Sequence, residues 1–307
     1  MRFGALVAIA LLIPALAEGA SPSWKRAAPL PLARGEVAAA VAEGRIYVVG
    51  GFTASGQAST RVEAYSPATN TWSIEADLPA PVHHPMAAGY RGRVYVAGGY
   101  GPDQQLATLL AFTGDGWTRL ASMPEDRAAG GAAVVNGRLY VVAGTTSSPA
   151  GRLAKRMLVY DIAANRWTTR RGPTPREHLG VTALGGRIYA VGGRTFGFDT
   201  NMALVERFNP RTGRWTRLPK VPGRRGGTGA AGTGRWIVSV GGEAPSGTIR
   251  TVYRYDVRRR RWSRLPNLPT PRHGLGVAAV GGKVYVIGGG TSPGLSVSQA
   301  NESLAVR

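Results

Sequence analysis

A short hydrophobic segment that ends in two small residues recurs six times along this 307-residue chain. The six pairs are Gly50-Gly51, Gly98-Gly99, Ala143-Gly144, Gly192-Gly193, Gly241-Gly242 and Gly288-Gly289. They follow one another every 45 to 49 residues, a period typical of small structural units that bury their hydrophobic faces by packing against each other. The chain is therefore expected to fold as an array of six similar units.

Each unit has the pattern of a four-stranded antiparallel sheet. Ahead of each pair, a strand of small residues leads through a glycine-containing turn such as Asn136-Gly137 into an apolar strand such as residues 46–49. Asn-Gly and Gly-Gly favour the tight type I′ turn that joins two hairpin strands. A variable loop, a third strand that contains an aromatic residue, a polar turn and a fourth strand follow. We name the strands a to d.

Strand d opens on a tryptophan, found in the first five units as Trp72, Trp117, Trp167, Trp215 and Trp262. An exposed indole can stack against sugars. A tryptophan at the same place in every unit is better explained by core packing, because the indole supplies a large buried area to a unit too small to bury its own face. We expect the paired glycines to leave room for this indole beside the backbone.

The double glycine, the aromatic residue in strand c and the tryptophan of strand d together resemble the kelch repeat. The resemblance covers residues 24–307 and implies an all-β, six-bladed β-propeller. The third unit departs from the pattern with Ala143, the fourth has Ala190 within strand b, and the fifth has Trp236 in place of the strand-b tyrosine.

The two ends of the chain are expected to meet in one blade. The last repeat supplies strands a and b and a short strand c (303–306), but no tryptophan follows. At the other end, Trp24 and the Pro29-Leu30-Pro31 segment match the fourth strand that begins at Trp262. The N-terminal strand is therefore predicted to complete blade six and close the ring, which also covers exposed sheet edges.

The first residues have the pattern of a secretory signal peptide. Arg2 is followed by an apolar run up to Leu16, and Ala15-Leu16-Ala17 offers small residues for cleavage. We expect a signal peptide at 1–17, with cleavage after Ala20 or a retained N-terminal anchor as alternatives, and a propeller domain at 18–307. The mature protein is then expected to be a soluble monomer, periplasmic or secreted, with no membrane span.

The composition excludes several chemistries. The chain contains no cysteine, so we expect no disulfide, no thiolate nucleophile, no lipidated N-terminal cysteine and no cysteine-ligated metal. Its net charge is +21, carried mainly by arginine. This charge is explained either by a GC-rich genome or by attraction to polyanions such as acidic glycans, and no specific nucleic-acid partner is expected.

Function is expected on the face that carries the d–a and b–c loops, because variable loops on a rigid scaffold are common binding sites. Five repeats place an arginine just before strand a, and Arg194 follows a glycine pair. The predicted ligand-binding residues are Arg34, Arg127, Arg176, Arg194, Arg224 and Arg272. Two interpretations stay open: each repeated arginine bonds nearby loop carbonyls, or their guanidinium groups converge on a carboxylate or phosphate.

Catalysis has weaker support. Acid–base candidates lie near the starts of strand a, but they have no spacing signature: Glu36, Glu177, His178, His83, His84 and His273. His83-His84 could bind a metal, yet adjacent loop histidines are more often incidental, so no metal and no cofactor is expected. The chain is therefore interpreted as a binding or scaffolding protein for a protein partner or an acidic ligand. The alternatives are an N-acetylneuraminate epimerase-like sugar-acid mutarotase and a non-specific polyanion binder.

Overall fold

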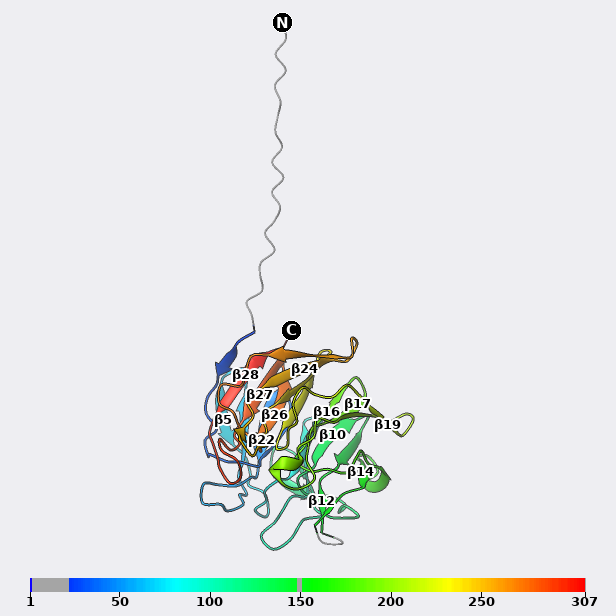
Figure 1. Ribbon diagram of the computed structural model, residues 1–307. Helices are drawn as coiled ribbons and strands as arrows, with labels where there is room; N and C mark the ends of the chain where they lie inside the picture. The colour runs from blue at the N-terminus through cyan, green and yellow to red at the C-terminus, as the bar shows by residue number, and fades with distance from the viewer. Residues whose placement is uncertain (2–21, 148–150, 307) are drawn as a thin grey trace.

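Six four-stranded antiparallel sheets stand around a central channel in the computed structural model, which describes residues 1, 22–147 and 151–306 (Figure 1). The predicted signal peptide at 1–17 lies, apart from Met1, outside the described residues. Within the described part of the chain, no helix has the length and apolar character needed to cross a membrane. The predicted all-β, six-bladed propeller is confirmed.

Each blade follows the predicted order of strands from the channel outwards. The first three blades are β2 (Ala38–Ala42), β3 (Arg45–Val49), β4 (Val62–Ser66), β5 (Thr71–Ile74); β6 (Met86–Tyr90), β7 (Arg93–Ala97), β8 (Leu109–Phe112), β9 (Trp117–Arg119); and β10 (Gly131–Val135), β11 (Arg138–Val142), β14 (Arg156–Asp161), β15 (Arg166–Arg171). The fourth and fifth are β16 (Gly180–Leu184), β17 (Arg187–Val191), β18 (Val205–Asn209), β19 (Arg214–Arg217); and β20 (Gly229–Thr233), β21 (Trp236–Val240), β24 (Val252–Asp256), β25 (Arg261–Leu265).

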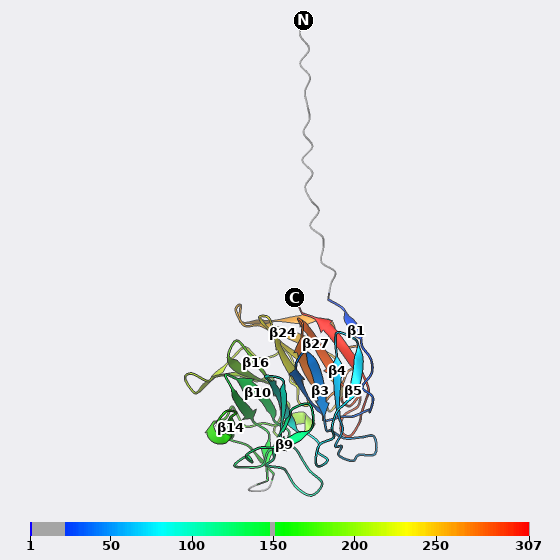
Figure 2. The ribbon, with the colours of Figure 1, turned by 180° about the vertical axis from the view of Figure 1, so that it is seen from behind.

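The sixth blade joins the two ends of the chain, as predicted. It consists of β26 (Gly276–Val280), β27 (Lys283–Ile287), β28 (Asn301–Ala305) and, outermost, the N-terminal β1 (Trp24–Arg26). Trp24 pairs with Leu304 in this sheet, and Figure 2 shows β1 beside the C-terminal strand. The innermost strands β2, β6, β10, β16, β20 and β26 each pack against the next around the channel, and β26 packs against β2.

The b–c loops contain two short hairpins and one helical turn. The hairpins are β12 (Thr145–Thr146) with β13 (Arg152–Leu153), and β22 (Glu243–Ala244) with β23 (Gly247–Thr248). The 3₁₀ turn η1 spans Phe198–Thr200 in blade four. These additions lie on the b–c side of the ring, so the loops that differ between blades gather on one face.

The predicted hairpin turns are present between strands a and b. Asn136 and Gly137 have φ of 50° and 72°, as a type I′ turn requires, and Gly185 and Gly186 behave alike. Each b strand is buried on both faces, since neighbouring blades cover it.

The tryptophans join successive blades, which supports their structural interpretation. Trp72 packs against Tyr65 of its own blade, with ring centroids 5.2 Å apart, and its indole N–H donates to the carbonyl of Ala28 in the preceding blade. The other five strand-d tryptophans donate in the same way to the preceding blade: Trp117 to Ala76, Trp167 to Ala121, Trp215 to Arg171, Trp262 to Pro219 and Trp24 to Pro266.

The glycine pairs serve a different purpose from the one expected. A Cβ on Gly50 would stand 2.6 Å from the carbonyl oxygen of Val82, and a Cβ on Gly51 would stand 2.5 Å from that of Gly35. Both glycines also have positive φ, a conformation that costs glycine little. The pair therefore makes room for the backbone that precedes the a strands, and not for an indole.

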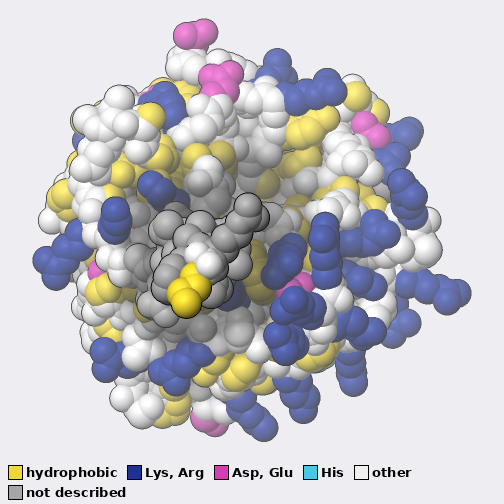
Figure 3. All heavy atoms as spheres, turned by 90° about the horizontal axis from the view of Figure 1, so that it is seen from above, with side chains coloured by type: hydrophobic (Ala, Val, Ile, Leu, Met, Phe, Trp, Pro, Cys, Tyr) yellow, Lys and Arg dark blue, Asp and Glu magenta, His cyan; other side chains and the backbone are white. Residues whose placement is uncertain are grey.

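Lysine and arginine dominate the face formed by the a–b and c–d turns. Viewed from that side, basic side chains gather densely over one part of the surface and acidic side chains are sparse (Figure 3).

Candidate functional site

Four of the six predicted binding arginines are buried inside the blades. Arg34, Arg127, Arg176 and Arg272 are 0% exposed. Arg176 donates from Nε to the carbonyl of Gly192 at 2.7 Å and from Nη1 to the carboxylate of Glu206 at 2.5 Å. Their guanidinium groups therefore hold the b–c loop of their own blade and do not line the channel mouth, which matches the structural interpretation.

The same arrangement recurs in other blades. Arg272 donates to the carbonyl of Gly288 at 2.7 Å and to Glu302 at 2.7 Å, and Arg34 contacts Gly50 and Glu63 likewise. Arg127 reaches the carbonyl of Ala143, with Glu125 as its carboxylate partner. Each of these arginines lies sixteen residues before the residue whose carbonyl it holds.

In blade five the equivalent of these buried arginines is Arg225, the neighbour of the predicted Arg224. Arg224 is exposed, whereas Arg225 is 0% exposed and donates to Thr251. The constant spacing of sixteen residues to the first glycine of the pair selects Arg225, so the sequence contained the signal. Burial lowers the pKa of Arg225 to about 10, which leaves it charged at neutral pH.

One residue from each blade forms a ring around the channel mouth, immediately before strand a. The ring positions are Glu36, His84, Ala129, His178, Gly227 and Gly274, and all six have positive φ between 52° and 64°. Each backbone N–H from His84 to Gly274 donates to the carbonyl of the preceding ring residue at 2.8–3.2 Å, and Val37 N–H donates to Gly274 to close the circle. The backbone is therefore the same in every blade, and only the side chains differ.

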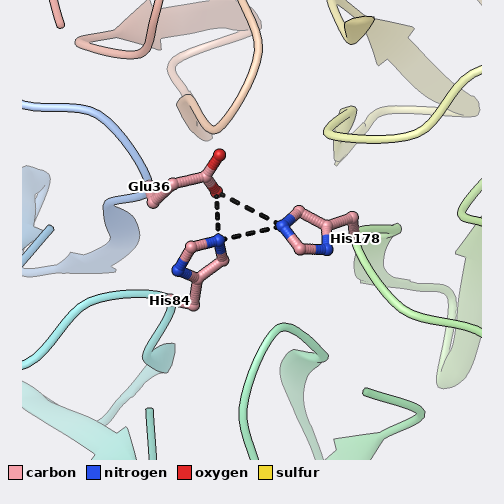
Figure 4. A group of neighbouring side chains, drawn as sticks. All are labelled: Glu36, His84 and His178. Carbon is pink, nitrogen blue, oxygen red and sulfur yellow. Dashed lines mark hydrogen bonds and ion pairs between the residues drawn. The ribbon is translucent and has the colours of Figure 1, made fainter. Parts of the chain in front are cut away.

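The weak acid–base candidates converge at this ring. The protein has only four histidines, and His83, His84, His178 and His273 all belong to this cluster. His84 Nε2 lies 2.9 Å from His178 Nε2 and 3.1 Å from Glu36 Oε2, as Figure 4 shows. Sequence spacing could not reveal this convergence, because the three residues come from blades one, two and four.

A second layer of polar groups supports the ring. Glu177 accepts a hydrogen bond from Nδ1 of His178 through one carboxylate oxygen and from Nε of Arg194 at 2.8 Å through the other. Arg194 also donates to Glu243 at 2.8 Å. Of the predicted arginines, Arg194 therefore does lie at the mouth, but its charge is already paired with two carboxylates.

The remaining polar contacts complete the cluster on the blade-six side. His273 Nδ1 lies 3.1 Å from Glu36 Oε1 and 3.4 Å from Glu243 Oε1. Two sets of side chains have the spacing of metal ligands: Glu36 with His84 and His178, and Glu36 with Glu243 and His273.

Burial and charge shift the pKa values of these groups in opposite directions. Burial lowers the pKa of His83 to about 4 and that of His84 to about 3, so both are neutral at pH 7. Burial opposes ionisation of Glu36, but the neighbouring imidazoles and the hydrogen bond with His273 hold its pKa below the usual range. Burial likewise opposes the charge on His273, and its contact with Glu36 and Glu243 outweighs this and raises its pKa.

A cavity of about 430 Å³ opens above the ring on the d–a/b–c face. Its floor holds Glu36, His84 and His178, and its walls include Phe52, Tyr100, Phe198 and Leu295. Arg194 lines this cavity as well, and Phe196, in the same loop as Phe198, is 46% exposed. The ring residues also line the hollow between the six innermost strands.

Comparison with known proteins gives the same family over most of the chain. The KLHDC2/KLHL20/DRC7 Kelch-repeats domain model matches residues 20–171 and 123–289. Kelch-like protein terF of Aspergillus terreus is 31% identical over 244 residues, covering 75% of this chain and 43% of the relative.

Two further relatives show similar partial coverage. Kelch-like protein 25 of Xenopus tropicalis is 29% identical over 229 residues, 71% of this chain and 30% of that protein. Kelch-like protein 30 of Homo sapiens is 38% identical over 206 residues, which cover 65% of this chain and 34% of that protein. The chain thus spans less than half the length of each. With six blades in the structure and a family model matched along the ring, this chain belongs to the Kelch-repeat family.

Proposed function

We propose that this propeller is a binding protein that recognises a protein partner through its d–a/b–c face. The observation that carries the proposal is the exposure of apolar side chains in two loops that border one cavity, the blade-six loop of Leu295 and the blade-four loop of Phe198. Leu295 of blade six is 62% exposed and Phe196 of blade four is 46% exposed. Aromatic and aliphatic anchors around a polar centre are typical of protein interfaces.

The family supports this proposal at a coarser level. Kelch-repeat domains are generally protein-interaction scaffolds, and most are not enzymes. The cavity adds a concave surface with apolar walls and a charged floor, which suits a projecting segment of a partner better than a flat surface would.

An acidic ligand has less support than a protein partner. Four of the arginines that would bind a carboxylate or phosphate are enclosed in the blades, and Arg194 is paired with Glu177 and Glu243. The mutarotase and polyanion alternatives relied on the same arginines or on net charge alone, and no contact in the cavity favours either over a protein partner.

The proposal includes export. The apolar run that ends near Ala17 supports a periplasmic or secreted protein. Cell fractionation followed by N-terminal sequencing tests this part, and recovery of an uncleaved cytoplasmic chain would contradict it.

Partner binding is tested with charge substitutions on the loop face. Immobilised wild-type protein and the variants Leu295→Asp, Phe196→Asp and Ile74→Asp are incubated with extract of the source organism, and bound proteins are identified by mass spectrometry. Ile74 is a matched control, because it is 63% exposed on the outer strand β5, away from the cavity. We expect a partner that binds wild type and Ile74→Asp but is lost with Leu295→Asp and Phe196→Asp. Equal recovery with all four proteins, or loss with Ile74→Asp alone, would overturn the proposal.

A further inference from the structure

Three side chains at the floor of the cavity have the geometry of a metal site. The triangle formed by Glu36 Oε2, His84 Nε2 and His178 Nε2 has sides of 2.9, 3.1 and 3.9 Å. A circle through corners with these separations has a radius of about 2.0 Å, and zinc binds imidazole nitrogen and carboxylate oxygen at about 2.0–2.2 Å. One ion close to the plane of the three atoms would therefore reach all of them at normal bond lengths.

The orientation of His178 is fixed by its neighbour. The carboxylate of Glu177 accepts the Nδ1–H of His178, so the Nε2 of the neutral imidazole presents its lone pair to the centre of the triangle. A carboxylate on the far nitrogen of a histidine ligand is the usual support of metal-binding histidines.

His84 has a comparable support. Its Nδ1 lies 2.6 Å from Nδ1 of His83, which accepts a hydrogen bond in the tautomer that has the His84 proton on Nδ1. His84 Nε2 then faces His178 Nε2 at 2.9 Å, and two imidazole lone pairs at this distance repel each other unless a cation or a proton lies between them. Ala129, the ring residue between the two histidines, is small enough to let the rings meet.

The backbone supplies an independent observation. Glu36, His84 and His178 have φ of 52°, 53° and 52°, a left-handed conformation that costs a residue with a side chain about 1–2 kcal/mol. Blades five and six place glycine at the same ring position and avoid that cost. Strained residues concentrate where function needs them, and here three of the four non-glycine ring residues form the triangle.

The second candidate set of ligands is less suited to a cation. The guanidinium Nη1 of Arg194 already donates to Glu243 Oε1 at 2.8 Å, and that same oxygen faces His273. A fixed positive charge at this distance disfavours a metal ion beside Glu243. His273 instead holds the other oxygen of Glu36, which orients that carboxylate toward the triangle.

We propose that Glu36, His84 and His178 bind one divalent transition-metal ion of the zinc class at the mouth of the channel. Two histidines and one carboxylate are ligands for this class of ion. The three side chains are each 10–13% exposed and border the cavity, so a fourth coordination position faces the space in which a water molecule or a group of a bound partner would lie. This site differs from the sequence-based expectation of no metal, and it does not depend on the proposed protein partner.

The test is a titration of the full chain, free of any histidine tag and first treated with chelator, with Zn²⁺ alone by isothermal titration calorimetry. Co²⁺ serves as a spectroscopic probe, because its visible absorption reports nitrogen and oxygen ligands in a low-coordinate site. We expect one ion per chain, and a fall in affinity of at least 100-fold in His84→Gly and His178→Gly. Glycine is the replacement of choice, since Gly227 and Gly274 show that the ring accepts it.

Four further variants make the result specific. Glu36→Gln removes the carboxylate ligand and is expected to lower the affinity for Zn²⁺ as the two histidine variants do. Glu177→Gln is expected to weaken Zn²⁺ binding about 10–100-fold through the orientation of His178. Glu43→Gln is the matched control for Glu36→Gln, because Glu43 is exposed and also has positive φ, and we expect no change in affinity for Glu43→Gln. His273→Asn is expected to change the affinity less than 10-fold.

Several outcomes overturn the proposal. They are the absence of Zn²⁺ binding to the folded wild-type chain, binding that His84→Gly and His178→Gly both retain, and loss of binding in His273→Asn but not in these two variants. Circular dichroism of each variant shows that it is folded, so a loss of binding reports the site.

Discussion

The buried pair of Arg176 and Glu206 offers a stringent test of how each blade is held together. The two side chains are 0% and 6% exposed, and the guanidinium also donates to the carbonyls of Gly192, Ala190 and Thr174. Blade two has no such pair: Val82 replaces the arginine, and Leu110 replaces the glutamate opposite it. Blade two therefore shows that apolar side chains can occupy both positions.

The single substitutions Arg176→Val and Glu206→Leu should each lower the free energy of unfolding by about 3–5 kcal/mol, because each leaves a buried charge without its partner. The double variant, which copies blade two, removes both charges. Its free energy of unfolding should fall by only about 1–3 kcal/mol, because the backbone carbonyls that the arginine contacted lose their hydrogen-bond donor. The coupling energy between the two sites is therefore expected to be about 3 kcal/mol or more.

Equilibrium unfolding in guanidinium chloride measures all four proteins of this cycle, with the slope compared to confirm that the same surface is exposed. The double variant should be more stable than either single variant. If the two losses instead add, the arginine stabilises the loop only through the carbonyls, and the explanation of its pairing with Glu206 is wrong.

Three further predictions follow from single contacts. Trp24→Ala removes the indole that donates to Pro266 and packs in blade six, and it should lower the free energy of unfolding by about 3 kcal/mol in the same assay. The control Lys25→Ala, on the same strand, should change the free energy of unfolding by less than about 0.5 kcal/mol. In Gly274→Ala the added Cβ collides with the Glu36 carboxylate, so Zn²⁺ affinity should fall at least 10-fold. The free energy of unfolding should fall by about 1–2 kcal/mol, because alanine adopts a positive φ here as Ala129 does at its own ring position. Unchanged affinity would show that Glu36 is not a ligand. Asp126 accepts hydrogen bonds from Thr146 and Ser147, and although its partial burial opposes ionisation, these bonds hold its pKa below the usual value. A depressed carboxyl pKa stabilises the folded state above the usual value, about 3.9, and this stabilisation is lost as the pH falls through the lowered one. The protection factor of the Ser147 amide, which corrects for the pH dependence of intrinsic exchange, should therefore stay constant from pH 7 to 5 and fall only below about 3.9, and Asp126→Ala should lower it at every pH.

The architecture could be predicted from the sequence because it depends on local, repeated signals. Turn glycines, the aromatic residue of strand c and the tryptophan of strand d each act within one blade or between neighbours, so their spacing is preserved in the chain. Ring closure by Trp24 was predictable for the same reason, since the missing strand had a matching segment at the other end.

The site was harder to predict because it is assembled across the ring. His84 and His178 meet only because the channel brings blades two and four together and blade three contributes Ala129 between them. The repeated arginines were predicted to bind a ligand because they occur in five blades. In the structure the arginine at this repeat position is buried, and in four blades it donates to the carbonyl sixteen residues further along the chain, so it holds the b–c loop. Arg194, which occurs in one blade only, is the predicted arginine that does reach the mouth.

The closed circle of backbone hydrogen bonds at the mouth has a consequence for how such proteins diversify. Five ring residues donate their N–H to the preceding ring carbonyl and Val37 closes the circle, so these backbone bonds form without any contribution from a side chain. Glycine, alanine, glutamate and histidine already occupy equivalent places in one molecule. The six positions of the mouth therefore share one backbone conformation and differ in their side chains. Where the neighbouring side chains leave room for a Cβ, binding chemistry can change there by single substitutions while the scaffold stays the same.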